Sequence, residues 1–456
     1  MTALWTSEEA QGATLGIPSR IFEVGGLSID TRTLKKNDLF IALKGENRDG
    51  HDYVKAAFDA GAGAALVTHR PANVASGSPL LTVANTQRGL EDLAAAARAR
   101  SDAKIIAVTG SAGKTTTKEI LRIALGALGT THASAASYNN QWGVPLSLAS
   151  LPRDARYGVF EIGMNHFGEI RSLVGFVRPH VAMVTTIAPA HLEFFGTCEA
   201  IADAKSEIFG GIMPGGAALI PADSAYADRL VARARQAHVA RVLKFGAAAQ
   251  SDARLTDYVE SNEGAQVRAD ICGTPVEFRI GAPGKHIAEN AVGALLAVAT
   301  ADGDVLNAAA ALRQFTALSG RGARFSTAGA EIIDESYNAN PASMAAALAL
   351  LGAAKGRRIA VLGDMLEMGP GGLAHHASLS LPIEDARADL VFLCGSQMKA
   401  LWEALPPSRR GGYAASSTEL AQPLLDALKD GDTVLVKGSL GSKMAVIIDA
   451  LKARGA

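Results

Sequence analysis

Short apolar runs that end in glycine or polar residues recur along this chain of 456 residues. From residue 104 they alternate with segments whose apolar residues follow a helical spacing, a pattern typical of a parallel sheet with right-handed crossovers. The pattern predicts strands at residues 105–108, 157–162, 181–187 and 217–220, and a helix that contains Ile120, Leu121, Ala124 and Leu128.

Two further blocks flank this central one. Residues 1–100 contain apolar runs at 39–43, 64–67 and 80–83, followed by an alanine-rich helix with Leu90 and Leu93. Near a hinge-like Ser-Gly-Arg-Gly stretch at 319–322, a third block begins, and its runs indicate a smaller doubly wound α/β domain. These runs lie at 331–334, 358–362, 390–393 and 433–436. We therefore predict an α/β protein with blocks at 1–100, 101–316 and 317–456.

The composition, with 48% hydrophobic and 20% charged residues, is that of an ordinary soluble globular protein. The net charge of -1 gives no general attraction to nucleic acid or to an anionic membrane, and we expect no membrane span. The cysteines, Cys198, Cys272 and Cys394, are widely spaced, show no metal-binding pattern and suit a reducing cytoplasm.

A glycine-rich turn follows the first strand of the central block and opens its helix. Its backbone amides and the helix N-terminus would surround phosphate, with Lys114 on the terminal phosphates and the Thr115 hydroxyl on Mg²⁺. The turn is shorter than a full Walker A motif, because Val108 stands where that motif has glycine. A plain turn that enters a helix is the alternative. The expected phosphate contacts are Gly110, Ser111, Ala112, Gly113, Lys114, Thr115 and Thr116.

Polar side chains follow the next two strands, and ligands of open parallel sheets bind beyond the carboxyl ends of strands. Glu161 lies in an apolar stretch, where a carboxylate is costly unless it meets a cation such as Mg²⁺. It could instead bond to a helix start or pair with a lysine. His191 could ligate a metal or position phosphate, and a plain loop role is the alternative.

Lys205 is less conspicuous. In residues 200–210 a helical pattern places it on the same face as Ile201 and Ile208. A lysine there must snorkel to solvent, pair with an acid or lose its charge. A neutral lysine can also react with CO₂ to give a carbamate, which behaves as a carboxylate.

The outer blocks carry polar clusters as well. In the third block, residues 334–341 (DESYNANP) and 437–439 (KGS) follow strands; Asn340 also suits a helix cap, and Lys437 and Ser439 suit an anion or an ordinary loop. In the first block, polar segments flank the run at 39–43 and could hold a diphosphate sugar, with a solvated hairpin as the alternative. Its candidates are Ser28, Thr31, Arg32, Lys44 and Asn47.

Together these motifs resemble those of the Mur ligases, the ATP-dependent amide-forming enzymes of peptidoglycan precursor synthesis. The resemblance covers nearly the whole chain, in the same order. It includes DTR, KGEN-x-DGHD, TGSAGKTTTK, YNNQWGVPL, EIGMN, His191, AKSE, GKH, Asn290, Gly320-Arg321, DESYNANP, GDMLEMG and KGS. SYNANP, NN-x-x-GVPL and GDMLEMG resemble the branch that adds D-Ala-D-Ala to UDP-N-acetylmuramoyl-tripeptide.

The resemblance implies a UDP-binding N-terminal domain, a central ATPase domain and a Rossmann-like C-terminal domain. It implies a catalytic set of Lys114, Glu161, His191 and Lys205. Thr115, Glu161 and His191 would hold Mg²⁺, and a carbamylated Lys205 would bind a second Mg²⁺. Further implied contacts are Asn290 to adenine, Arg321 and Asp334 to nucleotide at the hinge, Asn139 and Asn140 to the UDP-linked substrate, and Asn338, Asn340, Lys437 and Ser439 beside the cleft.

The implied reaction begins when the tripeptide carboxylate attacks the γ-phosphate of ATP, which gives an acyl phosphate and ADP. The amine of D-Ala-D-Ala then displaces phosphate, while closure of the third domain around residues 320–322 excludes water. We expect a cytoplasmic enzyme, a monomer, with no nucleic-acid partner.

Three positions depart from the family pattern. Ile287 stands where the wider superfamily often has Asn, and Trp142 stands where related chains often have a smaller residue. Leu440 follows KGS where related chains often have Arg or Asn, which puts an arginine contact there in doubt. Another ligase of the superfamily is an alternative that SYNANP disfavours. A P-loop kinase or regulatory NTPase is disfavoured by Glu161, where such proteins usually have Asp, and by the KGS motif. A catalytically silent binding protein would not need Lys114, Glu161, His191 and Lys205. The third residue of the tripeptide, meso-diaminopimelate or L-lysine, is not indicated.

Overall fold

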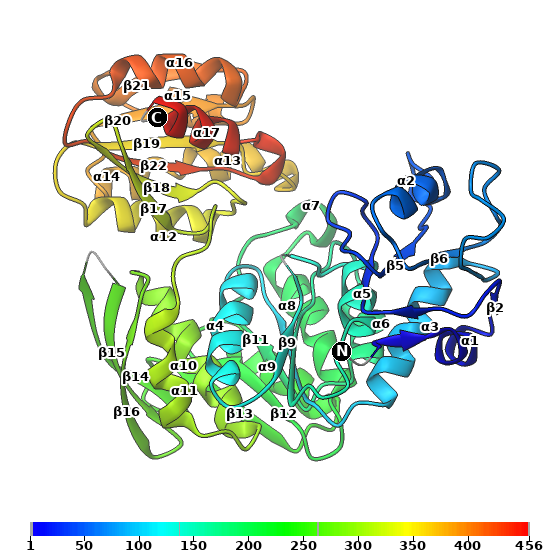
Figure 1. Ribbon diagram of the computed structural model, residues 1–456. Coiled ribbons are helices and arrows are strands. Elements are labelled where there is room, and N and C mark those ends of the chain that lie inside the picture. Colours follow the sequence, from blue (N-terminus) through cyan, green and yellow to red (C-terminus); the bar gives the residue numbers. More distant parts are fainter. Residues whose placement is uncertain (1–2, 136, 262–263, 455–456) are drawn as a thin grey trace.

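The computed structural model describes residues 3–135, 137–261 and 264–454, whose strands form three large sheets and one two-stranded ribbon. Figure 1 shows the sheets as three successive bodies, coloured blue, cyan to green, and yellow to red along the chain. This is the three-domain α/β architecture that the sequence predicts. Within the described ranges, no helix is both long enough and apolar enough to cross a membrane.

The N-terminal sheet has the order β2-β7-β6-β5-β4, in which only β2 runs antiparallel to its neighbour. Strands β5 and β6 are buried along their whole length because α3 packs on one face and α2 on the other. The run at 39–43 is therefore a buried strand, whereas the polar segment after it forms a largely exposed turn with an antiparallel bridge between Lys44 and Asp49, as the alternative of a solvated hairpin expects. The elements are β1 (Trp5–Thr6), α1 (Ser7–Thr14), β2 (Ile17–Pro18), β3 (Glu23–Val24), β4 (Gly26–Ser28), β5 (Asp38–Ile41), α2 (Val54–Asp59), β6 (Ala64–Val67), β7 (Leu80–Thr82) and α3 (Thr86–Ala99).

The central sheet has the order β16-β15-β14-β13-β12-β11-β8-β10-β9. The four predicted strands are confirmed as part of its parallel portion, although β11 ends at Val184 and the Thr185 hydroxyl after it donates to Ala112 O of the glycine-rich turn. The elements are β8 (Lys104–Thr109), α4 (Lys114–Gly126), β9 (Thr131–Ala133), α5 (Gly143–Ala149), β10 (Tyr157–Glu161), α6 (Glu169–Val177), β11 (Val181–Val184), α7 (Leu192–Phe195), α8 (Cys198–Ser206), β12 (Ala217–Pro221), α9 (Ala227–Gln236), β13 (Arg241–Gly246), β14 (Ala253–Ser261), β15 (Gly264–Ile271), β16 (Thr274–Ile280), α10 (Lys285–Thr300) and α11 (Val305–Ala311).

Strands β14, β15 and β16 extend this sheet as an antiparallel meander that the sequence analysis did not predict. Their residues alternate between buried and exposed, since one face packs on α10 and the other meets solvent. Such strands lack the continuous apolar runs by which the other strands were recognised.

The C-terminal sheet has the order β17-β18-β22-β19-β20-β21 and is parallel except for the edge strand β17. Its four predicted strands are confirmed, and β17 and β21 are additional edge strands. The elements are β17 (Ala323–Thr327), β18 (Ala330–Glu335), α12 (Pro341–Gly352), β19 (Arg358–Gly363), α13 (Gly372–Ala377), α14 (Ser380–Asp385), β20 (Leu390–Cys394), α15 (Met398–Ala404), β21 (Arg410–Ala414), α16 (Ser417–Ala427), β22 (Thr433–Lys437) and α17 (Ala445–Arg454).

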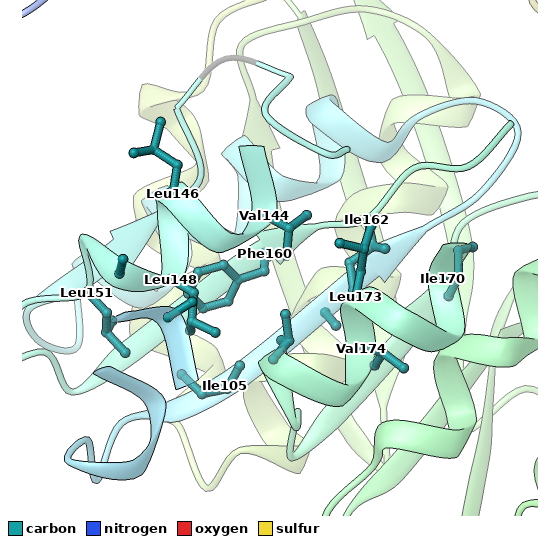
Figure 2. Close-up of a cluster of buried hydrophobic side chains, with 14 of the residues drawn as sticks. Ile105, Val144, Leu146, Leu148, Leu151, Phe160, Ile162, Ile170, Leu173 and Val174 are labelled. Carbon is teal, nitrogen blue, oxygen red and sulfur yellow. The ribbon is translucent and has the colours of Figure 1, made fainter. Parts of the chain in front are cut away.

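One hydrophobic core joins the first two domains. It runs from the N-terminal sheet through α3 to α5, α6 and the central sheet, and Figure 2 shows its central part around Phe160 and Leu148. The Trp5 indole also donates a hydrogen bond to Ala149 O at 2.9 Å. The C-terminal domain has separate cores on the two faces of its sheet. The third domain therefore has cores of its own, and Leu192 of the central domain packs against one of them.

We predict that Leu148→Ala lowers the free energy of unfolding by about 2–5 kcal/mol, because it leaves a cavity in this shared core. Leu306→Ala is the matched control, because Leu306 lies on α11 with 58% of its surface exposed and should change stability by less than about 0.5 kcal/mol. Urea unfolding monitored by circular dichroism measures both, and equal losses would contradict this description of the core.

Candidate active site

A cavity of about 520 Å³ lies between the carboxyl ends of the central parallel strands and the start of the third domain. It is lined by the glycine-rich turn on one side and by residues of the 334–341 segment on the other. The predicted residues that line it are Ser111, Ala112, Gly113, Lys114, Thr116, Asn139, Glu161, His191, Lys205, Asn290, Arg321, Asn338, Asn340 and Lys437.

The glycine-rich turn has the conformation of a phosphate loop. Gly113 has a left-handed φ of 79°, and a Cβ there would lie 2.8 Å from Nδ2 of Asn290, so the position requires glycine. No side chain caps the first amides of α4, which leaves them available to an anion. Lys114 Nζ donates to Gly110 O at 2.9 Å. Burial lowers the pKa of Lys114.

Glu161 is held by two neighbours at the end of β10. The Thr115 hydroxyl donates to one carboxylate oxygen and the Asn139 amide to the other, both at 2.7 Å. Only 1% of Glu161 is exposed. Thr115 lies in the first turn of α4. The alternative in which Glu161 bonds to a helix start is therefore observed, and the same bond places Glu161 beside the phosphate loop, as predicted.

This donor set fits Mg²⁺. The ion prefers oxygen ligands and usually takes one or two carboxylates together with substrate phosphates. Glu161 and Thr115 would supply a carboxylate and a hydroxyl beside the phosphate loop. In the described part of the chain, no group of three or more His, Cys, Asp or Glu side chains is arranged to hold a metal.

Lys205 lies at the end of α8 with 1% of its surface exposed, and it lines the same cavity. Burial, and then the nearby charge of Lys114, lowers the pKa of Lys205 well below its ordinary value. No snorkelling to solvent occurs, and no hydrogen bond to Lys205 Nζ is seen from any described residue. The predicted options of snorkelling and pairing with an acid are therefore not seen, and the lowered pKa favours the remaining option, loss of charge.

His191 also faces the cavity, in a left-handed conformation with φ of 58°. Its Nδ1 lies 2.5 Å from Oε2 of Glu367, a residue of the third domain. The hydrogen bond to His191 lowers the pKa of Glu367. Glu367 stands in the GDMLEMG motif, but its 176-residue separation from His191 gives no sequence signal of this contact.

Several hinge-side residues cross between the domains. Arg321 donates to Ser137 Oγ at 3.2 Å, and its guanidinium lies 4.0 Å from the centre of the Tyr337 ring. Asn340 caps α12 by accepting from Ser343 N, and its Nδ2 donates to Ser111 O at 3.4 Å. The predicted helix cap is thus confirmed.

Other predicted residues hold the backbone of the site in shape. Asp334 accepts from Gly320 N at 2.8 Å and from Ser336 Oγ at 2.6 Å, away from the cavity lining. Lys437 Nζ donates to Asn338 O at 2.9 Å and to Glu335 at 3.1 Å. Ser439 Oγ accepts from Leu366 N at 2.9 Å.

The remaining predicted residues are not in the cavity lining. Asn140 Oδ1 accepts from Gly143 N at 2.9 Å, next to the start of α5. Arg32 pairs with Asp30, and this pairing lowers the pKa of Asp30. Gly110, Thr115, Asp334 and Ser439 lie behind the lining, and Ser28, Thr31, Arg32, Lys44 and Asn47 lie in the N-terminal domain.

The sequence analysis missed several lining residues. Thr185 donates to Ala112 O at 2.6 Å, and Ser137 bonds to Arg321, so both shape the site directly. His286, in the GKH motif, lies in the lining with its pKa lowered by burial. The glycine that precedes this helix start was the sequence signal by which His286 could have been identified. Asp223, Phe245 and Glu289 had none.

The comparisons with known proteins agree with this geometry. Three family models match: Mur ligase family, catalytic domain, over residues 23–125; Mur ligase middle domain over 108–298; and Mur ligase, glutamate ligase domain, over 320–440.

Curated relatives and solved structures match nearly the full length. The UDP-N-acetylmuramoyl-tripeptide--D-alanyl-D-alanine ligase of Escherichia coli (strain K12) is 36% identical, over 98% of this chain and 96% of its own. The enzyme of the same name from Rickettsia prowazekii (strain Madrid E) is 34% identical, over 98% and 99%. A crystal structure of MurF from Acinetobacter baumannii matches with a TM-score of 0.86 at 30% identity, covering 98% of this chain and 99% of that one.

The lowered pKa of Lys205 predicts a pH-dependent stability. Between the folded pKa and the ordinary lysine value, the folded state is neutral and the unfolded state binds a proton, so stability rises with pH by up to about 1.4 kcal/mol per unit. Lys205→Met lacks this contribution, and its stability advantage over the wild type should shrink as pH rises. Urea titrations in CO₂-free buffer measure this, and parallel pH curves would refute it.

Proposed function

The chain belongs to the Mur ligase family, and from this premise we propose that its cavity joins D-Ala-D-Ala to UDP-N-acetylmuramoyl-tripeptide at the expense of ATP. The observation that carries the proposal is the cavity itself. It combines a phosphate loop, a buried carboxylate and the buried Lys205 from one domain with the DESYNANP segment of another. A simple NTPase would not need the second domain at its phosphate site.

The reaction has two steps. The tripeptide carboxylate attacks the γ-phosphorus of ATP, and the bond to the β-phosphate oxygen breaks to release ADP. The amine of D-Ala-D-Ala then attacks the acyl carbon, the carbon–oxygen bond to phosphate breaks, and a proton is lost from nitrogen. A free carboxylate is a poor acylating group, so phosphorylation supplies the leaving group.

The residues of the phosphate loop would act mainly by electrostatics. The amides of α4 and the Lys114 ammonium would stabilise the charge on the transferring phosphoryl group. In this structure, Lys114 Nζ donates to Gly110 O. When nucleotide binds, Lys114 would exchange this carbonyl oxygen for phosphate oxygens. Asn290, 8% exposed beside Gly113, would contact the adenine, and Arg321 the nucleotide at the hinge.

Mg²⁺, when bound, would neutralise phosphate charge and hold the reacting oxygens in place. Glu161, Thr115 and His191 would hold one ion. A carbamate on Lys205 would hold a second, because a buried neutral amine is the form that reacts with CO₂. The lowered pKa of Lys205 and its lack of a hydrogen-bond partner among the described residues support this modification.

The outer domains would bind the substrates. The N-terminal domain, residues 1–100, would bind the UDP-sugar through Ser28, Thr31, Arg32, Lys44 and Asn47, with Asn139 and Asn140 on the central side. Trp142 supports this arrangement, because its ring packs close to Gly45 of the KGEN loop: a Cβ added to Gly45 would lie 3.2 Å from the ring. Residues 101–316 would bind ATP. Residues 317–456 would close on D-Ala-D-Ala with Asn338, Asn340, Lys437 and Ser439. A monomeric cytoplasmic enzyme remains our expectation.

We predict that phosphate release requires ATP, UDP-N-acetylmuramoyl-tripeptide and D-Ala-D-Ala together, because the acyl phosphate is trapped unless an amine accepts the acyl group. A coupled phosphate assay that omits each compound in turn measures this. Release that does not depend on D-Ala-D-Ala would exclude the proposed acceptor.

We predict that Lys205→Ala abolishes ligation and that short carboxylates restore part of it, because they can take the place of the carbamate. The exposed lysine substitution Lys55→Ala is the control and should leave turnover unchanged. Unchanged turnover in Lys205→Ala would refute the carbamate.

A further inference from the structure

The loop after β19 contacts the loop after β11 across the domain boundary. Glu367 Oε2 lies 2.5 Å from Nδ1 of His191, and Glu193 N donates to Glu367 O at 3.1 Å. Gly369 is closely packed there, since a Cβ would lie 3.2 Å from Cα of Glu193. The third domain therefore contacts the segment that carries His191 through both backbone and side chain.

Both partners of this contact adopt an uncommon backbone conformation. His191 has φ of 58° and Glu367 has φ of 62°, and neither is glycine. Left-handed residues of this kind persist where the surrounding structure holds them, often at functional sites. Two such residues that meet across a domain boundary point to a functional contact.

The loop that carries Glu367 is firmly held by its own domain. Met365 N donates to Nε2 of the buried His376 at 2.9 Å, and Leu366 N donates to Ser439 Oγ at 2.9 Å. Asp364 O accepts from Ser439 N and from Ser442 Oγ. The KGS motif thus supports the GDMLEMG loop. Consequently the position of Glu367 follows that of the whole third domain.

One ring nitrogen of His191 has a partner in the third domain. Nδ1 faces Glu367, which is outside the cavity lining, whereas the His191 side chain itself belongs to that lining. A carboxylate accepts a hydrogen bond from the protonated Nδ1, so Nε2 is the nitrogen that carries the lone pair. A histidine ligates a metal only through such a nitrogen, and its other ring N–H is commonly held by a carboxylate.

We propose that Glu367 is the positioning residue for His191: its carboxylate holds the Nδ1–H tautomer and presents Nε2 to the cavity, so that docking of the third domain prepares the metal site. This rests on the proposed function, because it takes His191 as a metal ligand there. Domain docking and metal binding are then coupled, and each strengthens the other.

The first test reads the tautomer directly. In full-length protein labelled with ¹⁵N in its histidine rings, at a pH above the ordinary histidine pKa, the His191 signals are identified by their loss in His191→Gln. We expect protonated Nδ1 and bare Nε2 in the wild type and in Glu367→Gln, whose amide oxygen still accepts. Glu367→Ala should shift His191 toward the Nε2–H tautomer. The same tautomer in Glu367→Ala as in the wild type would overturn the proposal.

The second test measures metal affinity without turnover. Mn²⁺ is titrated into the protein with ADP and followed by electron paramagnetic resonance. Glu367→Ala should bind Mn²⁺ about 10- to 100-fold more weakly. Glu193→Gln should match the wild type, because this exposed residue lies in the same contact and contributes only its backbone. Equal Mn²⁺ affinity in all three proteins would overturn the proposal.

The two proposals fail in different ways. If the wild type releases phosphate without D-Ala-D-Ala, the proposed function fails, whatever the His191 tautomer. If the wild type ligates as proposed but Glu367→Ala keeps the tautomer and the Mn²⁺ affinity, only the role of Glu367 fails. Circular dichroism of Glu367→Ala confirms that the variant is folded.

Discussion

The cavity depends above all on the buried carboxylate of Glu161. The parallel register of β10 against β8 places Glu161 opposite Val108, just before the phosphate loop. An unpaired carboxylate at that depth would cost several kcal/mol, and the Thr115 hydroxyl and the Asn139 amide offset that cost. One side chain therefore links a strand end, the start of α4 and the 139–142 segment. The same oxygens are those that Mg²⁺ prefers beside phosphate.

The third domain is held differently from the other two. The N-terminal and central domains share one hydrophobic core, whereas polar contacts such as Arg321 with Ser137 and Asn340 with Ser111 cross the cavity. Polar interfaces of this kind permit relative motion of domains. A ligase needs such motion, because its substrates must enter a site that later excludes water. The Glu367–His191 contact would make closure and metal binding one event.

Much of this could be predicted from the sequence where a local pattern determines the structure. Continuous apolar runs identified the buried parallel strands, and glycines before Lys114 identified the phosphate loop. The half-exposed strands β14–β16 were not predicted, because alternating buried and exposed residues give a weaker sequence signal than a continuous apolar run. Glu367 escaped because its role depends on a contact between distant segments. Asp334 and Asn140 were recognised as site residues, but their hydrogen bonds to nearby amides, which shape the backbone, appear only in the fold.

The most direct test of the account is a crystal structure of the full chain grown with ADP and Mn²⁺, with anomalous diffraction to locate the metal. The account predicts ADP phosphates on the amides of residues 111–116 and an anomalous peak in contact with Glu161 and Thr115. Nucleotide bound at another place, or phosphates in the loop with the metal away from Glu161, would contradict it.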